Sequence, residues 1–286
     1  MYPSSFEYHR ASSVADALAM LEQYGDDAKV LAGGHSLLPI MKLRFATPSH
    51  LIDIGRIAAL DGITESAGTV TIGAMTRHAD VASSAGIAKS LRAVSEAAAA
   101  IGDAQVRNRG TIGGSLAHAD PGADLPAVMV AMGAQIVATG KSGDRTIAAE
   151  SFFTDTFATS LRKGELITQI RIPVPAAGSG SAYVKYADAA SGYAVVGVAA
   201  LVTVAGGTVK AARVAMTGAS SRAMRLAAVE AALIGKPANA TSAAAAAQST
   251  SAGLDLYDDA RGSAAYKANL AAVYVARAVN TALSRA

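Results

Sequence analysis

The chain has 286 residues, 51% of them hydrophobic and only 5% aromatic, which is enough apolar material for more than one buried core. The formal charge is +3, but Lys and Arg are dispersed and never interleaved with aromatic residues, which argues against nucleic acid as a partner. Because there is no cysteine, the chain can form no disulfide and can hold neither an iron-sulfur cluster nor a thiolate zinc site.

The sequence shows no targeting or membrane-spanning segment. The N-terminus lacks a basic region followed by an apolar run. The longest apolar stretch, around residues 193–205, is well short of the ~20 residues that a spanning helix needs. We therefore expect a cytoplasmic protein.

The first half of the chain alternates short helices and strands. Ser13 and Asp16 form a capping-box pattern, which predicts a helix that ends at Gly25. Apolar residues recur at steps of four and three from residue 87 to residue 101, which predicts one amphipathic helix ending at Gly102. Strands are expected at residues 29–32, 51–54, 69–72, 135–139 and 165–172.

A glycine-rich stretch at residues 109–124 is the most informative segment. Three glycines and two hydroxyl residues within seven positions favour a turn whose bare backbone N–H groups bind phosphate oxygens. A helix at 125–132 is predicted to follow, with Asp124 as its N-cap and Pro126 in its first turn. A second glycine loop, at residues 32–36, follows a predicted strand, so two phosphate cradles are expected.

The second half begins after a Pro- and Gly-rich linker at residues 173–180, where we place a domain boundary. Gly206 and Gly207 form a tight-turn pair between two of the three antiparallel strands expected at 182–186, 195–204 and 208–216. Helices are expected at 222–234, in the alanine-rich segment and at the C-terminus. The last helix is predicted to face the core with Tyr266, Leu270, Val273 and Tyr274.

Motifs of other enzyme classes are weak or missing. Neither a Rossmann G-x-G-x-x-G motif nor a P-loop is present, and residues 113–117 only faintly resemble a serine-hydrolase elbow. His118 and Asp120 are an alternative acid/base pair. The five histidines, which include none spaced at i, i+3 or i, i+4, give little support for a metal site: His9, His35, His50, His78 and His118.

Longer motifs surround both glycine loops. They comprise residues 32–39, 41–44 and 107–115 with Asp120, Pro121 and Asp124, and shorter segments at 152–153, 161–162, 164–167, 170–173, 183–185 and 192–194. Together they resemble the FAD-binding medium subunits of the molybdenum hydroxylases over nearly the whole chain. The first loop is most similar to the flavoprotein subunits of aerobic carbon monoxide dehydrogenases.

The resemblance implies an α+β fold. It consists of a p-cresol methylhydroxylase-type FAD-binding domain at residues 1–176, made of two small α/β subdomains at about 1–57 and 58–176. A C-terminal domain at 177–286 is implied to combine a three-stranded antiparallel sheet with helices. Strands and linker read from the residues agree with this division.

The resemblance also assigns roles to particular residues around a noncovalently bound FAD. The pyrophosphate is implied to be held, chiefly by backbone N–H groups, at Ala32, Gly33, Gly34, His35 and Ser36 and at Thr111, Ile112, Gly113, Gly114 and Ser115. Asp124 is implied to accept hydrogen bonds from a cofactor hydroxyl, and Tyr193 to cover the isoalloxazine ring. Ile101, Leu166 and Lys185 match positions that line the flavin site, although Ile101 and Leu166 also suit an ordinary core.

The function implied is electron transfer within a larger enzyme, with no catalytic residue and no metal site on this chain. A large subunit would carry the molybdopterin cofactor and a small subunit the iron-sulfur clusters, in a heterohexamer that is a dimer of heterotrimers. Electrons would leave through FAD to an external acceptor such as a quinone. The complex is expected in the cytoplasm, where its partners could associate it with the inner face of the membrane.

One departure and two alternatives bear on this interpretation. Relatives often have an Arg and then an Asp between the positions of Lys185 and Tyr193, whereas this chain has Asp188 followed by small residues, so the electron acceptor can differ.

One alternative is a self-sufficient FAD oxidase with the flavin attached at His35, although about 110 residues after the linker leave little room for a substrate domain. The other is a scaffold in which both glycine loops are plain turns.

Overall fold

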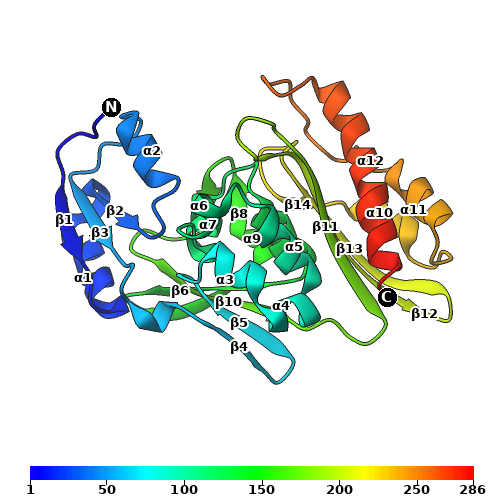
Figure 1. Cartoon of the computed structure of the whole chain (residues 1–286), viewed down its shortest axis with the longest axis horizontal. Helices are drawn as coiled ribbons and strands as arrows, with labels where there is room; N and C mark the ends of the chain where they lie inside the picture. Colours follow the sequence, from blue (N-terminus) through cyan, green and yellow to red (C-terminus); the bar gives the residue numbers. More distant parts are fainter.

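The computed structural model describes all of residues 1–286, with three sheets arranged along the long axis of the molecule (Figure 1). The N-terminal sheet is parallel, in the order β1-β3-β2, and comprises β1 (Glu7–Arg10), β2 (Ala28–Leu31) and β3 (His50–Asp53). The helices of this lobe are α1 (Val14–Tyr24) and α2 (Leu37–Lys42). The predicted N-cap of α1 is confirmed, because the Ser13 hydroxyl accepts the Asp16 N–H at 3.1 Å.

The middle sheet has five antiparallel strands in the order β4-β5-β10-β6-β7. They are β4 (Ile63–Ser66), β5 (Thr69–Gly73), β6 (Gln135–Gly140), β7 (Gly143–Ala148) and β10 (Leu166–Pro173). The helices of this part lie on one side of the sheet (Figure 1). They are α3 (His78–Ser83), α4 (Ala85–Ser90), α5 (Arg92–Ala100), α6 (Ala104–Arg107), α7 (Ile112–His118), α8 (Asp124–Ala131) and α9 (Ala149–Phe152). Two minor strands, β8 (Phe153–Asp155) and β9 (Ala158–Thr159), pair with each other, and two 3-10 turns occupy Gly25–Asp27 and Ala58–Leu60.

The single helix expected at residues 87–101 is wrong, because the chain breaks at Leu91 into α4 and α5. Leu91 leaves helical geometry, with φ −138° and ψ 58°. The first turn of α5 is then capped from a distant strand, since the Ser181 hydroxyl accepts the Ala93 N–H at 3.3 Å. The apolar residues that suggested one helix still face the core on both sides of the break, because Ile87, Leu91 and Val94 are all fully buried.

The C-terminal sheet contains the three long antiparallel strands that were predicted: β11 (Ser179–Ala187), β12 (Ala194–Ala205) and β13 (Thr208–Thr217). Gly206 and Gly207 have φ of 58° and 70°, as the tight turn requires. A two-residue strand, β14 (Met224–Arg225), pairs with β13, so the helix expected at 222–234 is shortened to α10 (Ala227–Leu233). The other helices are α11 (Ala240–Ala247) and α12 (Ala264–Leu283).

Both faces of β12 are buried, which explains its long apolar sequence. Ala199 packs into the core of the middle domain, while Val198 and Ala200 pack into the core under α10, α11 and α12. The predicted core face of α12 is confirmed in part, because Leu270 and Tyr274 pack against the core of the C-terminal domain, whereas Tyr266 and Val273 are exposed. The residues of α12 that are fully buried against the sheet are smaller, namely Ala271, Val275, Ala278, Val279 and Ala282.

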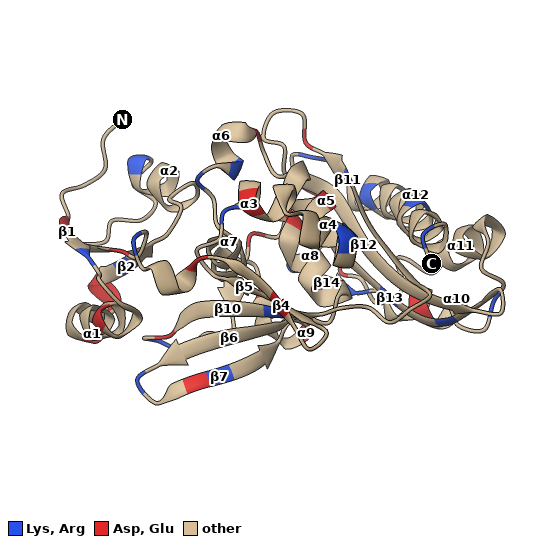
Figure 2. Ribbon diagram, turned by 60° about the horizontal axis from the view of Figure 1, so that its bottom comes forward, with Lys and Arg blue, Asp and Glu red and all other residues tan.

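Charged residues are scattered along the chain in all three parts of the molecule (Figure 2). None of the helices combines the length with the apolar character needed to cross a bilayer.

The cap on α5 gives a prediction about stability. Ser181→Ala leaves the buried Ala93 N–H without an acceptor, and we expect the free energy of unfolding to fall by about 1–3 kcal/mol. Ser251→Ala, at an exposed serine, is the matched control and should change it by no more than about 0.5 kcal/mol. Urea denaturation of both variants tests this, and equal stabilities would contradict the assigned cap.

Candidate functional site

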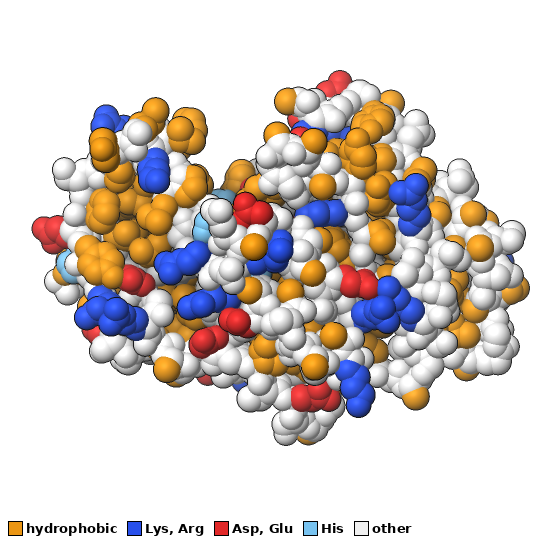
Figure 3. Space-filling view, in the orientation of Figure 1, with side chains coloured by type: hydrophobic (Ala, Val, Ile, Leu, Met, Phe, Trp, Pro, Cys, Tyr) orange, Lys and Arg blue, Asp and Glu red, His pale blue; other side chains and the backbone are white.

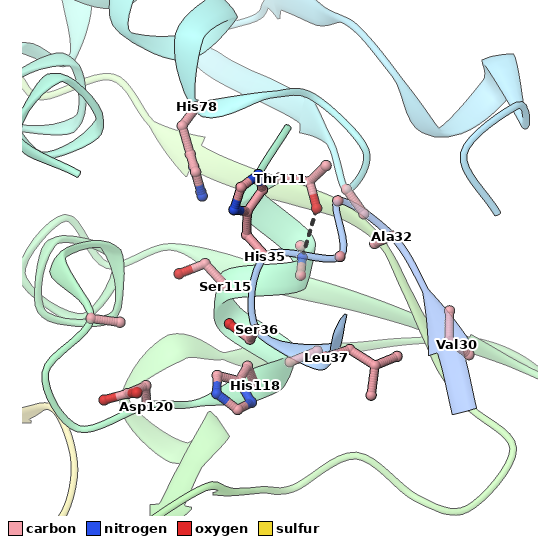
Figure 4. A pocket seen from close by; sticks show the side chains of 18 of the residues that line it. Val30, Ala32, His35, Ser36, Leu37, His78, Thr111, Ser115, His118 and Asp120 are labelled. Carbon is pink, nitrogen blue, oxygen red and sulfur yellow. Dashed lines mark hydrogen bonds between the residues drawn. The ribbon is translucent and has the colours of Figure 1, made fainter. Parts of the chain in front are cut away.

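A cavity of about 590 Å³ lies between the N-terminal lobe and the rest of the molecule. Figure 3 shows the surface hollowed between these two parts, and Figure 4 shows the interior. Its walls come from the loop after β2, the start of α7, the start of β10 and the loop before β12. Of the residues expected at the site, those that line the cavity are Ala32, Gly33, Gly34, His35, Ser36, Ile101, Thr111, Gly113, Gly114, Ser115, Asp124, Leu166 and Tyr193.

The loop between β2 and α2 offers a row of free hydrogen-bond donors to the cavity. The backbone N–H groups of residues 33–37 donate to no acceptor in the protein. Gly34 has φ 78°, a left-handed conformation that bends the chain at this point. Successive free N–H groups in such a bend form a concave binding site for an anion.

The second glycine stretch differs from expectation, because it is the first turn of α7 and not an open nest. Four N–H groups expected to bind phosphate donate within the protein instead. Those of Ile112 and Gly113 bond to the carbonyls of Thr76 and Ala74. Those of Gly114 and Ser115 bond to the side chain and the carbonyl of Thr111, and the first of these bonds is drawn in Figure 4. This segment lines the cavity with Thr111, Gly113, Gly114 and Ser115, of which Ser115 contributes a hydroxyl, whereas Ile112 is buried in the core.

The two glycine segments pack directly on one another. A Cβ on Gly33 would lie 2.1 Å from the carbonyl oxygen of Arg109, and a Cβ on Gly110 would lie 2.7 Å from the His78 ring. A Cβ on Gly114 would lie 2.8 Å from the Thr111 hydroxyl oxygen and, in ordinary contact, 3.6 Å from the Ala32 Cβ. The approach of Gly33 to the backbone at Arg109 and Gly110 is possible only for glycine, and it brings both segments to the same end of the cavity.

Asp124 is not the N-cap of α8. That position is held by Ala123, and Asp124 is the first residue of the helix, buried to 4% exposure. Its carboxylate accepts from the Tyr183 hydroxyl at 2.6 Å and lies 2.9 Å from the Lys185 ammonium. Burial raises the pKa of Asp124, and the ammonium and the phenol oppose that shift. Burial and this carboxylate raise the pKa of Tyr183 well above its usual value.

Lys185 does not line the cavity, in contrast to the expectation, but it positions the loop that does. Its ammonium also donates to the carbonyl of Gly192 at 2.7 Å, directly before Tyr193. Asp188 closes the other side of this loop, where its carboxylate accepts from the N–H and hydroxyl of Ser191. Burial and Asp120 raise the pKa of Tyr193. Tyr193 lines the same cavity as Ser36 of the first glycine loop.

His78 was not expected at the site, yet it lines the cavity close to His35 (Figure 4). It is 4% exposed, and its Nδ1 has no hydrogen-bond partner in the protein. Burial, together with the nearby His35, lowers its pKa to about 4, so the ring is neutral at physiological pH. The sequence around His78 gives no sign that this histidine is buried, because its burial depends on Gly110, a distant residue that packs against its ring.

His118 and Asp120, the alternative acid/base pair, also line the cavity. Burial lowers the pKa of His118, against the opposing effect of Asp120. One oxygen of the Asp120 carboxylate accepts the Gly122 N–H at 2.8 Å, as in a turn. No hydrogen bond joins the two side chains, so they do not form a preassembled acid/base pair.

Comparison with known families agrees with this geometry. Residues 4–175 match the family described as the FAD binding domain in molybdopterin dehydrogenase, and residues 181–282 match the CO dehydrogenase flavoprotein C-terminal domain. The chain belongs to the FAD-binding medium subunits of the molybdenum hydroxylases. Its cofactor is FAD, and it is one subunit of a multi-subunit oxidoreductase.

Full-length relatives support the same assignment. The carbon monoxide dehydrogenase medium chain of Hydrogenophaga pseudoflava is 46% identical, over 100% of this chain and 99% of its own length. The 6-hydroxypseudooxynicotine dehydrogenase complex subunit alpha of Paenarthrobacter nicotinovorans is 42% identical, over 100% and 97%. The structure of the Hydrogenophaga pseudoflava carbon monoxide dehydrogenase that lacks the Mo-pyranopterin moiety superposes with a TM-score of 0.96, at 48% identity and coverage of 100% and 99%. The family and the α+β fold class expected from the sequence are confirmed.

The buried His78 predicts a pH-dependent stability. An unfolded chain protonates this histidine below about pH 6.5, whereas the folded chain resists protonation until about pH 4. Its stabilising contribution is therefore complete above pH 6.5 and is lost as the pH falls toward 4. From pH 7 to pH 4, the free energy of unfolding should decrease by about 3 kcal/mol more in the unmodified chain than in His78→Leu. Urea denaturation across this range tests it, and parallel pH profiles would contradict a neutral buried imidazole.

Proposed function

We propose that this chain is the electron-transfer flavoprotein subunit of a carbon monoxide dehydrogenase-like enzyme, with FAD bound noncovalently in the cavity. The row of free N–H groups at residues 33–37 is the observation that carries the proposal. A pyrophosphate supplies the oxygens that these donors lack, and the Ser115 hydroxyl faces the same cavity. When bound, FAD supplies a redox centre that the side chains of this protein do not provide.

Tyr193 is proposed to cover the flavin ring. Its aromatic side chain lines the cavity, and its loop is held by Lys185 and Asp188. The Asp124 carboxylate at the start of α8 forms a buried ion pair with Lys185. This ion pair fixes the loop that carries Tyr193 relative to α8. Since both oxygens of Asp124 already lie close to donors, we assign it a positioning role in addition to any contact with a cofactor hydroxyl.

The protein's task is positioning, not acid/base chemistry. Neutral His78 and the apolar side chains of Ile101 and Leu166 give the cavity a lining that is uncharged and largely apolar on this side. A wall of this kind limits the access of water to the cofactor and leaves one open side. No side-chain nucleophile or general base is required for electron transfer.

The substrate and the other redox centres are proposed to reside on partners. This chain has no cysteine to bind iron-sulfur clusters, so a small subunit would carry them and a large subunit the molybdopterin cofactor, in a dimer of heterotrimers. Exposed apolar side chains on the N-terminal lobe, including Leu43 and the 81% exposed Phe45, suit contact with a partner. Figure 3 shows hydrophobic side chains gathered on that lobe. Electrons would pass on to an external acceptor such as a quinone.

We also propose that the chain divides at about residues 57 and 176 into two FAD-binding subdomains and a C-terminal domain. Three hydrophobic clusters support this division, each centred on one of the three parts, although the middle cluster also takes in Ala199 and Ala215 of the C-terminal sheet and the N-terminal cluster takes in Leu60 and Leu166. The oxidase alternative is not proposed. The match at residues 181–282 to the CO dehydrogenase flavoprotein C-terminal domain occupies the place where an oxidase needs a substrate domain.

Gly114→Val tests the position of the cofactor. A Cβ at this position would lie 2.8 Å from the Thr111 hydroxyl oxygen, so the larger side chain should displace the Thr111 cap of α7, obstruct the pyrophosphate and weaken FAD binding by at least about tenfold. Gly86→Val, in α4, is the matched control, because its Cβ meets only the Ser84 hydroxyl at 3.8 Å. Flavin fluorescence titration and thermal unfolding are measured together. Full FAD occupancy in Gly114→Val would contradict the placement of the pyrophosphate beside Gly114.

The function itself is tested by anaerobic titration. The FAD-loaded chain alone should be reduced by dithionite but not by carbon monoxide, purines or aldehydes, because it has no substrate site. Adding the iron-sulfur and molybdenum subunits should let the substrate, carbon monoxide in our proposal, bleach the flavin absorbance. Acid precipitation should release the flavin into solution. Bleaching of the isolated chain by a substrate, or flavin retained at His35, would overturn the proposal.

A further inference from the structure

Three metal-ligating side chains meet on the N-terminal sheet, outside the cavity. Glu7 and His9 are two residues apart on β1, so their side chains project from the same face. The parallel register places His50 of β3 directly opposite Glu7. None of the three lines the cofactor cavity.

The donor atoms form a compact triangle. His9 Nε2 lies 3.1 Å from His50 Nδ1, and the Glu7 carboxylate lies 3.5 Å from His50 Nδ1 and 3.8 Å from His9 Nε2. A tetrahedral metal ion with ligands at 2.0–2.1 Å separates neighbouring donor atoms by roughly 3.3–3.4 Å. The triangle therefore has the dimensions of one face of such a tetrahedron before any ion binds.

The two imidazole rings are held in place by packing. Tyr24, the last residue of α1, stacks on His50 with ring centroids 4.0 Å apart and on His9 at 4.6 Å. The side chains of His9 and His50 are only 19% and 21% exposed, whereas Glu7 is 73% exposed. Two fixed ligands with one accessible carboxylate leave an entry path for an ion from solvent.

We propose that Glu7, His9 and His50 form a binding site for a divalent transition metal of the Zn²⁺ class. Two imidazoles and one carboxylate suit Zn²⁺ better than Mg²⁺ or Ca²⁺, which prefer all-oxygen ligands. The His9–His50 hydrogen bond is replaced by two metal bonds, and the ring that donates it moves its proton to its other nitrogen. A water molecule completes the fourth position.

The bound ion would tie β1 to the rest of the lobe. β1 is a four-residue edge strand that pairs only with β3, and its residues are largely exposed. Coordination adds a cross-link between these two strands, and it stabilises only the folded state because the unfolded chain does not hold the triangle together. The site is thus structural and independent of the proposed electron transfer.

Isothermal titration of the chelator-treated full chain with Zn²⁺ tests the proposal. We expect one equivalent to bind, and His9→Gln and His50→Gln each to weaken the affinity by at least about 100-fold, since removal of even a supporting group costs 10–100-fold. Glu22→Gln, on exposed α1, removes a carboxylate outside the site and should leave the affinity unchanged. Mg²⁺ and Ca²⁺ should not compete.

A second measurement separates this site from adventitious binding. Zn²⁺ should slow amide hydrogen exchange in β1 of the unmodified chain and of Glu22→Gln, but not of the histidine variants, with the same result whether or not FAD is bound. Thermal unfolding without metal checks that the variants fold. Zn²⁺ affinity equal in all variants, no binding in the unmodified chain, or unchanged exchange in β1 would each overturn the proposal.

Discussion

The close contact between two backbone segments, the loop at residues 32–36 and the chain at Arg109 and Gly110, underlies the rest of the site. With no Cβ on Gly33, the loop reaches the Arg109 carbonyl, and the N-terminal lobe is held against the middle domain there. The N–H groups of residues 33–35 in this loop, and those of Ser36 and Leu37 at the start of α2, have no acceptor in the protein, and these residues line the cavity. One steric requirement thus produces both the cavity and its anion-binding edge.

A buried ion pair connects this edge to the C-terminal domain. Asp124 at the start of α8 and Lys185 on β11 are both nearly inaccessible, and Lys185 also holds the Gly192 carbonyl. Desolvation offsets much of the attraction in such a pair, and we assign it a positioning role. The ion pair fixes the loop of Tyr193 beside the cavity. The continuous packing of β12 on α8 holds the two domains rigidly together at this point.

Local chemistry along the chain was sufficient to predict much of the fold. The capping pattern at Ser13, the alternating apolar residues of β5 and β10, and the Gly206–Gly207 turn each depend on neighbours within a few positions. Both glycine segments were recognisable for the same reason. The longer motifs around them were specific enough to indicate the family and its FAD, whereas the short exposed strands β1, β4 and β7 carry too little alternation to be predicted.

By itself the sequence determined the order of most elements, because this follows from local periodicity, and its motifs were specific enough for the family resemblance to imply the α+β class and the residues that could surround a cofactor. Tertiary structure decided which groups were free to act. It broke the expected helix at Leu91 and capped the first turn of α5 from Ser181, buried alanines and valines of α12 against the sheet while leaving Tyr266 exposed, and used the N–H groups of residues 112–115 inside the protein. It also buried His78 and brought Glu7, His9 and His50 together. In each case the deciding partner lies on another element, packed against the residue in space, and no local pattern reports such a partner.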